Sequence, residues 1–204
     1  ASIPEFVITQ PLTLGQSSRF EGTPSLIFKE DGTFEIKGDN SQTINNFYTE
    51  TKFKGDEEIE KATLMMSTCN NITIQGDYIY GYYLKDANRW YFLALPFDTK
   101  VGDLELVEGG NYAIRYYDGA ERATRLATGY SWKNFEADDI IPAGTGFIIQ
   151  VSKRGYVNFK AQNNATKQYA LKNMEFVKPM VKNTCESNAH KGWNLVGNPF
   201  QCYY

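Results

Sequence analysis

Paired carboxylates are the side chains of this chain that could support hydrolysis. A glycoside hydrolase needs two carboxyl groups on either side of the scissile bond. The available groups are Glu57 with Glu58, and Glu136 with Asp138 and Asp139. Each group lies in a polar segment typical of a turn, where water keeps the pKa of a carboxyl group near its ordinary value. We therefore expect no catalytic residue and keep a carbohydrate-active enzyme as the alternative.

Histidine and cysteine provide little material for catalysis or metal binding. The chain has one histidine, His190, in the polar turn SNAHKG, where a solvated side chain is expected. It contains no HExxH, GxSxG, GxxxxGKS/T or GxGxxG pattern. Cys69, Cys185 and Cys202 lack the CxxC spacing of a zinc site. We expect three buried thiols, with a disulfide between Cys185 and Cys202 as the alternative.

Two loop clusters contain oxygen ligands of the kind that bind calcium. They are Asp31, Asp39 and Asn40 in the first half, and Asp118 with Glu121 in the second. Neither cluster follows the order of an EF-hand loop. Side chains of these types commonly hydrogen-bond their own backbone in turns. We therefore expect no metal site and no cofactor.

Aromatic residues are the side chains that most favour a binding function. They make up 15% of the sequence, with 14 Tyr, 13 Phe and 3 Trp. Tyr78, Tyr80 and Tyr82 alternate along an expected strand, which would place their rings about 7 Å apart on one face. Tyr117 and Trp132 lie on either side of a turn. We predict these five as ligand-binding residues, because rigid rings on a sheet can stack on sugars or anchor a protein partner; the alternative is that they fill the core.

Short strands are the elements expected to hold these residues. Apolar runs of period two, separated by turn residues, recur along the chain, and helical periodicity is nearly absent. Asp31-Gly32 between the apolar runs SLIF and TFEI predicts a β-hairpin. About a dozen strands at this spacing predict an all-β fold, namely an antiparallel β-sandwich. Two related sandwich units and a jelly-roll-like arrangement remain open alternatives.

One apolar phrase occurs twice, as NRWYFLALPF at residues 88–97 and KGWNLVGNPF at residues 191–200. In an extended strand, Trp90, Phe92 and Ala94 share a face, as do their counterparts from Trp193 onward. We expect this face to lie in the core, and the proline of each copy to end the regular pairing. The phrase is either an internal repeat or a product of shared strand chemistry.

Composition argues against several classes of protein. Hydrophobic residues make up 42% and charged residues 22% of the chain, which is enough apolar surface for a core. The net charge is -3 with both signs interspersed, so we expect no nucleic acid partner. No apolar run approaches the roughly 18 residues of a membrane span, and no positively charged start followed by an apolar stretch marks a signal peptide. We expect a mature piece of a larger protein.

The second half of the chain resembles a known module. Four runs stand in the order found in a module of large secreted and outer-surface proteins of Bacteroidetes: RWYFLALPFDTKVGDL, YAIRYYDGAERA, YSWKNFEADDIIPAGTGFIIQV and GWNLVGNPF. The match covers residues 89–200, and the order of the runs is more specific than any one of them. The resemblance implies a β-sandwich and an extracellular or cell-surface location. It implies no activity, but adhesive and glycan-binding domains accompany the module, which favours an interaction role.

These observations lead to one expected organisation. Residues 1–88 form an N-terminal β region and residues 89–204 a C-terminal β-sandwich module, which can join into one domain. The expected function is non-catalytic binding or adhesion at the cell surface, without insertion into the membrane. The expected partner is a glycan or a surface protein of a host or bacterium. The alternatives are a carbohydrate-active enzyme, its carbohydrate-binding accessory domain, and a structural spacer.

Overall fold

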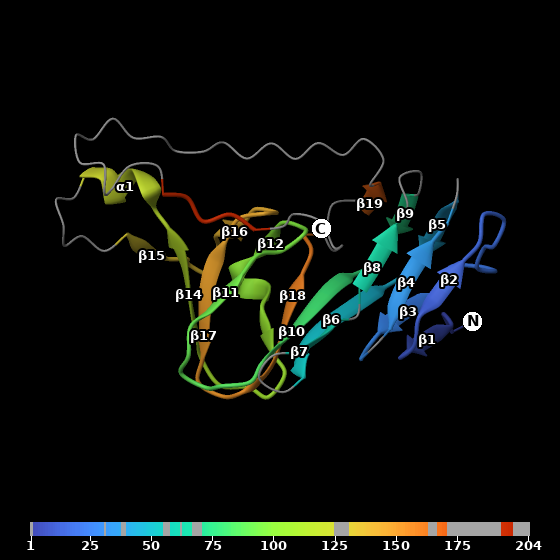
Figure 1. Cartoon of the computed structure of the whole chain (residues 1–204), viewed down its shortest axis with the longest axis horizontal. Helices are drawn as coiled ribbons and strands as arrows, with labels where there is room; N and C mark the ends of the chain where they lie inside the picture. Colours follow the sequence, from blue (N-terminus) through green and yellow to red (C-terminus); the bar gives the residue numbers. More distant parts are fainter. Residues whose placement is uncertain are drawn as a thin grey trace.

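The computed structural model of the chain describes residues 2–30, 32–37, 40–54, 58–61, 63–66, 71–124, 131–162, 167–170 and 193–197. Strands dominate this part of the chain, which contains nineteen strands, one short α-helix and one turn of 3-10 helix (Figure 1). This content confirms the prediction of an all-β fold.

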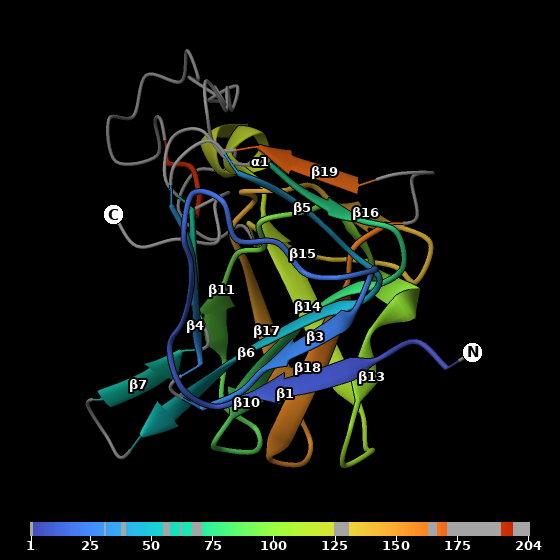
Figure 2. The same cartoon turned by 90° about the vertical axis from the view of Figure 1, so that its right-hand side faces the viewer.

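The N-terminal strands form three stacks in which successive strands run parallel. The first stack is β1 (Glu5–Ile8), β3 (Ser25–Phe28), β6 (Phe47–Lys54) and β10 (Tyr78–Leu84). The second stack is β2 (Leu12–Leu14), β4 (Thr33–Ile36) and β8 (Thr63–Met66). The third stack is β5 (Ser41–Ile44) and β9 (Asn71–Ile74), beside which β19 (Lys167–Ala170) adds an antiparallel strand. From β3 onward the chain visits the three stacks in rotation, so these strands wind as a parallel coil (Figures 1 and 2).

Successive circuits of this coil differ in length. Leu26 pairs with Phe47 in the next circuit, about 20 residues later. Phe47 in turn pairs with Tyr78, so that the following circuit is about ten residues longer. The additional residues contain the continuation of β6 and its antiparallel partner β7 (Glu58–Lys61). The longer circuit therefore carries a hairpin as an insertion.

The parallel coil corrects the predicted hairpin. β3 pairs with β1 and β6, and β4 pairs with β2 and β8, in every case parallel. Asp31 lies outside the described residues. Gly32 stands at the corner between β3 and β4, where a Cβ atom would collide with the carbonyl oxygen of Ile8 in the preceding circuit. The prediction of antiparallel pairing is wrong for these strands. Strands on either side of a hairpin and strands on either side of a corner in a coil both bury every second residue, so the alternation in the sequence does not distinguish them.

β10 connects the coil to the C-terminal strands. It pairs antiparallel with β18 (Gly155–Lys160), and β18 pairs with β13 (Glu105–Leu106). One sheet of seven strands thus runs in the order β1-β3-β6-β10-β18-β13, with β7 beside β6 (Figure 2). A second, antiparallel sheet has the order β11 (Tyr91–Leu93), β17 (Phe147–Val151), β14 (Tyr112–Tyr117) and β15 (Trp132–Asn134). The smaller elements are the pair β12 (Thr99–Lys100) and β16 (Ile140–Ile141), the 3-10 turn η1 (Val101–Asp103) and the helix α1 (Gly119–Thr124).

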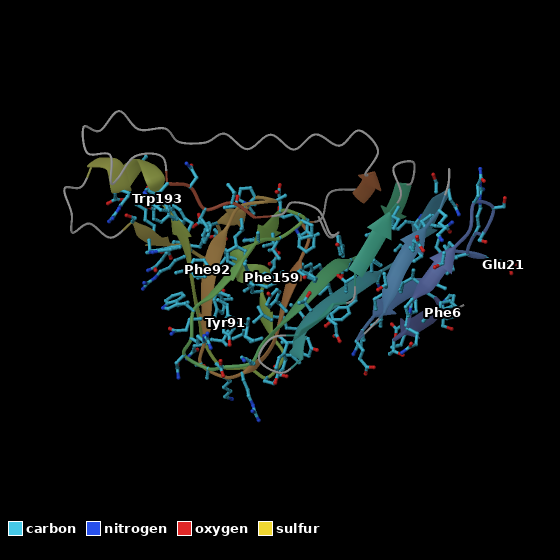
Figure 3. The ribbon with its side chains drawn as sticks, viewed as in Figure 1. Phe6, Glu21, Tyr91, Phe92, Phe159 and Trp193 are labelled. Carbon is cyan, nitrogen blue, oxygen red and sulfur yellow. The ribbon has the colours of Figure 1, made fainter. Side chains whose placement is uncertain are left out.

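One apolar core runs through both halves of the described chain. Tyr78, on β10, packs its ring against Phe47 in the coil and against Phe97 in the second half. Phe159 of β18 meets Phe147 of β17 with ring centroids 5.8 Å apart, and this contact joins the two large sheets (Figure 3). These rings are all buried. Truncating one such buried Phe to Ala typically costs about 3–5 kcal/mol, so the core dominates the stability of the fold.

Candidate functional site

Tyr78, Tyr80 and Tyr82 share one face of β10, but that face is the interior. Tyr78 is 2% exposed, and the centroid of its ring lies 5.3 Å from that of Phe47 and 4.7 Å from that of Phe97. Tyr80 and Tyr82 are partly buried against the core, with ring centroids 6.1 Å apart. Burial raises the pKa of Tyr82 to about 12. Of the two alternatives for this row, burial in the core therefore holds for Tyr78, because β10 is part of the wall of the coil.

Tyr117 and Trp132 lie instead on the outer face of the second sheet. They are paired across β14 and β15, with ring centroids 5.4 Å apart. The ring centroid of Phe92 of β11 lies 6.2 Å from that of Trp132. Phe92 is 66% exposed (Figure 3). We call Phe92, Tyr117 and Trp132 the aromatic patch. The structure thus brings together two of the five predicted residues and adds Phe92.

The exposure of Phe92 reverses a prediction. Alternation in residues 88–97 places Trp90, Phe92 and Ala94 on one face, which we expected to be buried. The structure buries Leu93 and Leu95 instead, so the other face of this strand points into the core. Large apolar residues occupy both faces of the strand. Periodicity therefore identified the residues that share a face but could not say which face is inside.

Trp193 is also exposed, to 63%, against its expected position in the core. The segment 193–197 lies along residues 144–146, through the bridge from Val196 to Thr145 and backbone hydrogen bonds. The carbonyl group of Trp193 lies against Gly119, which follows the end of β14. The Trp193 side chain therefore adds exposed aromatic surface at the end of the sheet where the aromatic patch lies (Figure 3).

Polar side chains border the aromatic patch. One row of paired residues crosses the second sheet from Phe92 through Ile148 and Arg115 to Asn134. Nε of Arg115 donates to Oδ1 of Asn134 at 2.9 Å, and the guanidinium lies 4.9 Å from the ring centroid of Trp90. Ile148 is buried beneath these groups. Rings of this kind can cover the C–H faces of a sugar, while a guanidinium and an amide can bind its hydroxyl groups.

An ion-pair cluster holds the ends of β14 and β15 together beside the patch. Nζ of Lys133 lies 2.7 Å from Oδ2 of Asp118 and 2.6 Å from Oε2 of Glu121. Oδ1 of Asp118 accepts the backbone N–H of Glu121 at 2.9 Å and so caps α1. The hydrogen bond from Lys133 lowers the pKa of Asp118. The hydrogen bonds to Asp118 and Glu121 raise the pKa of Lys133. The ammonium group of Lys133 thus binds the two carboxylates, Asp118 and Glu121, that the sequence offered as calcium ligands.

Asn40 is the described residue of the other calcium candidate, and it has a structural role. Asn40 is buried, and its Nδ2 donates to the carbonyl oxygens of Gly15 and Ser18 at 2.9 and 2.7 Å. It therefore ties a loop of the first circuit to the second. Asp31 and Asp39 lie outside the described residues. Within the described ranges, no group of three His, Cys, Asp or Glu side chains could hold a metal ion.

The carboxylates of residues 136–139 lie in a turn. Asp138 is exposed and pairs with Lys100 at 2.7 Å, and this hydrogen bond lowers the pKa of Asp138. Oδ2 of Asp139 accepts the backbone N–H of Glu136 at 2.7 Å. A general acid for glycoside hydrolysis needs a raised pKa instead. These groups stabilise the turn and its approach to β16.

Several candidate residues of the sequence are not in the described part of the chain. Nothing follows from the structure for Glu57, His190, Cys69, Cys185 and Cys202, nor for the side chain of Glu58. The interpretations given to them stay predictions.

Comparisons with known proteins identify no relative. No family model, curated protein or solved structure matches this chain. None of the helices in the described ranges combines the length and the apolarity of a membrane span. The likeness to the Bacteroidetes surface module accordingly rests on the order of four sequence runs.

Proposed function

We propose that this protein is a non-catalytic glycan-binding protein located outside the cell or on its surface. The aromatic patch of Phe92, Tyr117 and Trp132 would be its binding site. The exposure of Phe92 carries this proposal, since a large ring on a rigid sheet is left in water. Burying such a side chain under a ligand is worth roughly 1.5–3 kcal/mol. The extracellular location is supported by the resemblance of residues 89–200 to the Bacteroidetes module.

The geometry of the patch suits a sugar ring better than a flat aromatic ligand. The ring plane of Trp132 is inclined at 72° to that of Tyr117 and at 65° to that of Phe92. The three rings therefore form an angular surface. Pyranose rings present apolar C–H groups that pack on such rings, with hydroxyl groups around their rim. Arg115 and Asn134 lie where they can bind these hydroxyl groups. A glycan of a few residues is the ligand class that this combination favours.

We further propose that the C-terminal half is a β-sandwich that serves as a rigid base for the patch. The contact between Phe147 and Phe159 supports this, because it joins β17 of one sheet to β18 of the other. The inward residues of β17 are buried against this interface, while its outward residue Ile148 lies under the patch. A rigid base would lower the entropy lost when a ligand binds.

A surface protein is the second candidate partner. Large exposed rings also anchor protein interfaces, where Trp and Tyr are enriched in the residues that contribute most to affinity. A nucleic acid partner has less support, because the net charge is -3 and acidic groups flank the patch. If the patch has no partner, the protein is a structural spacer.

A glycan-array screen of the purified chain tests this proposal. The wild type would be compared with a double variant, Phe92→Ala and Trp132→Ala. The matched control is Ile3→Ala with Val7→Ala, which removes two exposed apolar side chains from the N-terminal region. We expect the wild type and the control to bind the same glycans and the patch variant to lose at least tenfold in affinity.

Circular dichroism and melting temperature would show that all three proteins are folded. Retention of glycan binding by the patch variant would reject the patch as the site. Absence of glycan binding by the wild type would reject the glycan as ligand, and loss of adhesion to whole cells in the patch variant would then identify a protein partner.

A further inference from the structure

A recessed surface lies on the outer face of the seven-stranded sheet. It is a groove of about 420 Å³ that crosses β3, β6, β10 and β18. Its walls include the rings of Tyr48 and Tyr156 and the apolar side chains of Ile79 and Val107. The groove belongs to a different sheet from the aromatic patch, so it does not depend on the glycan proposal.

A row of paired residues crosses the sheet at this groove, and two members of the row, Glu50 and Asn158, line the groove and form its polar floor. Glu50 of β6 pairs with Gly81 of β10, Gly81 pairs with Asn158 of β18, and Asn158 pairs with Glu105 of β13. Gly81 leaves a gap in the middle of the row, and the hydroxyl group of Tyr48 lies over it. That hydroxyl donates to Oε2 of Glu50 at 3.1 Å. The floor therefore consists of polar groups recessed between aromatic walls.

Hydrogen-bond acceptors outnumber donors in the floor. Glu50 is 7% exposed, and among the described residues it accepts hydrogen bonds from the Tyr48 hydroxyl and the backbone N–H of Glu30, at 3.1 and 3.4 Å. Nδ2 of Asn158 donates to Oε2 of Glu105 at 2.9 Å, which turns Oδ1 of Asn158 toward Gly81. This Oδ1 is buried and has no hydrogen-bond partner in the described part of the chain. A buried acceptor without a donor is costly, so the floor lacks a donor.

The charges around the groove favour a cationic donor. Lys160 is already paired with Asp77, at 2.9 Å, and Lys29 lies 5.9 Å from the ring centroid of Tyr48. Neither cation pairs with Glu50 among the interactions of the described residues. Burial and the neighbouring Glu50 raise the pKa of Tyr48, so its hydroxyl stays protonated as a donor to Glu50. Within the described ranges, the carboxylate of Glu50 consequently has no cationic partner.

We propose that this groove binds a primary alkylammonium group. An ammonium group has three N–H donors and no acceptor, which matches a carboxylate and an orphaned amide oxygen side by side. The faces of Tyr48 and Tyr156 can attract the same cation and pack on its alkyl chain. Such a group occurs in free polyamines and in the lysine side chains of polypeptides. The same acceptors would serve either source.

Calorimetric titration of the purified chain with 1,5-diaminopentane tests this assignment. The neutral isostere 1,5-pentanediol is the ligand control, and a lysine-containing tripeptide with blocked ends tests the polypeptide source. We expect the diamine or the tripeptide to bind and the diol to bind at least tenfold more weakly. Glu50→Gln should weaken the binding at least tenfold, while Glu21→Gln, an exposed carboxyl group elsewhere, should leave it unchanged.

The outcomes separate clearly. Binding of the diamine alone points to free polyamines, and binding of the tripeptide alone points to a polypeptide partner. Equal binding of the diol, or unchanged binding by a folded Glu50→Gln variant, would overturn the proposal, as would no binding of either amine. Amide NMR shifts of Gly81 and Asn158 in the wild type give a readout that needs no variant: they should move on titration.

Discussion

Tyr117 and Trp132 face each other across β14 and β15, with ring centroids 5.4 Å apart and ring planes inclined at 72°. This edge-to-face geometry sets the positive edge of one ring against the negative face of the other. The next residues along the chain, Asp118 and Lys133, form an ion pair at 2.7 Å. The same end of the sheet therefore holds both a stabilising cluster and the surface that we propose for ligand binding.

The contact between these two rings should be measurable as a coupling energy. We expect Tyr117→Ala and Trp132→Ala to be non-additive by about 0.5–1.5 kcal/mol, because each single change already removes the ring contact. Urea unfolding of the wild type, both single variants and the double variant measures this coupling energy. Additive effects would mean that the rings share a surface without stabilising each other.

Phe92 and Phe159 should differ sharply in their effect on stability. Phe92→Ala is expected to change the free energy of unfolding by no more than about 0.5 kcal/mol, since its ring is largely in water. Phe159→Ala should cost about 3–5 kcal/mol, because it leaves a cavity between the two sheets. Chemical denaturation measures both. A large loss for Phe92→Ala would show that this ring supports the fold, which would weaken its assignment as a binding residue.

Gly81 should not tolerate a side chain while Tyr48 keeps its hydroxyl group. A Cβ atom at residue 81 would collide with that hydroxyl oxygen, so Gly81→Ala is expected to destabilise the protein by about 1–3 kcal/mol. Tyr48→Phe in the same chain removes the nearest atom and should recover part of the loss. Thermal unfolding of the two single variants and the double variant tests this. No recovery in the double variant would place the conflict elsewhere.

Tyr82 should make stability fall at high pH. Its pKa rises from 10.0 to about 12 in the folded protein, mainly through burial. The unfolded chain thus loses this proton first, and the contribution to stability is complete below about pH 10 and lost as the pH rises toward about 12. Unfolding free energies measured across this range should fall less steeply for Tyr82→Phe than for the wild type. Equal slopes would contradict burial of the phenol.

Asp118 should have the opposite dependence on pH. The hydrogen bond from Lys133 lowers the pKa of Asp118 below 3.8, so its contribution is present above that value and lost as the pH falls through the folded pKa. Asp118→Asn keeps an oxygen that can cap α1 but removes the charge. The melting temperature of the variant should lie slightly below that of the wild type at neutral pH, and the two should converge in acid. The difference is small, below about 1 kcal/mol, because solvent screens the pair.

The position of Phe92 shows what alternation in the sequence cannot determine, namely which face of a strand is buried. Alternation grouped Phe92 with Trp90 and Ala94 on one face of an expected strand, just as it grouped Tyr78 with Tyr80 and Tyr82 on β10. Phe92 points outward, against its expected place in the core, whereas Tyr78 points inward, as in the alternative that these tyrosines fill the core. Apolar residues on both faces of these strands leave periodicity without a preferred side.

The partners of β3 and of β4 could not be predicted from the sequence, for a related reason. The Asp-Gly signal marked a turn, and Gly32 does stand at a corner between β3 and β4. Whether the chain then returns beside β3 or turns a corner depends on Ile8 and the other residues of the preceding circuit. Those contacts are not local, so no short window of sequence contains them.

The sequence by itself determined the all-β class, the approximate strands and the residues that share a face, because these follow from local backbone preference and side-chain alternation. Only the tertiary structure decided which strands pair, in which direction, and which face meets water. Those choices depend on contacts between distant segments, such as Glu50 with Gly81 and Phe92 with Trp132. Both proposed sites are products of such contacts.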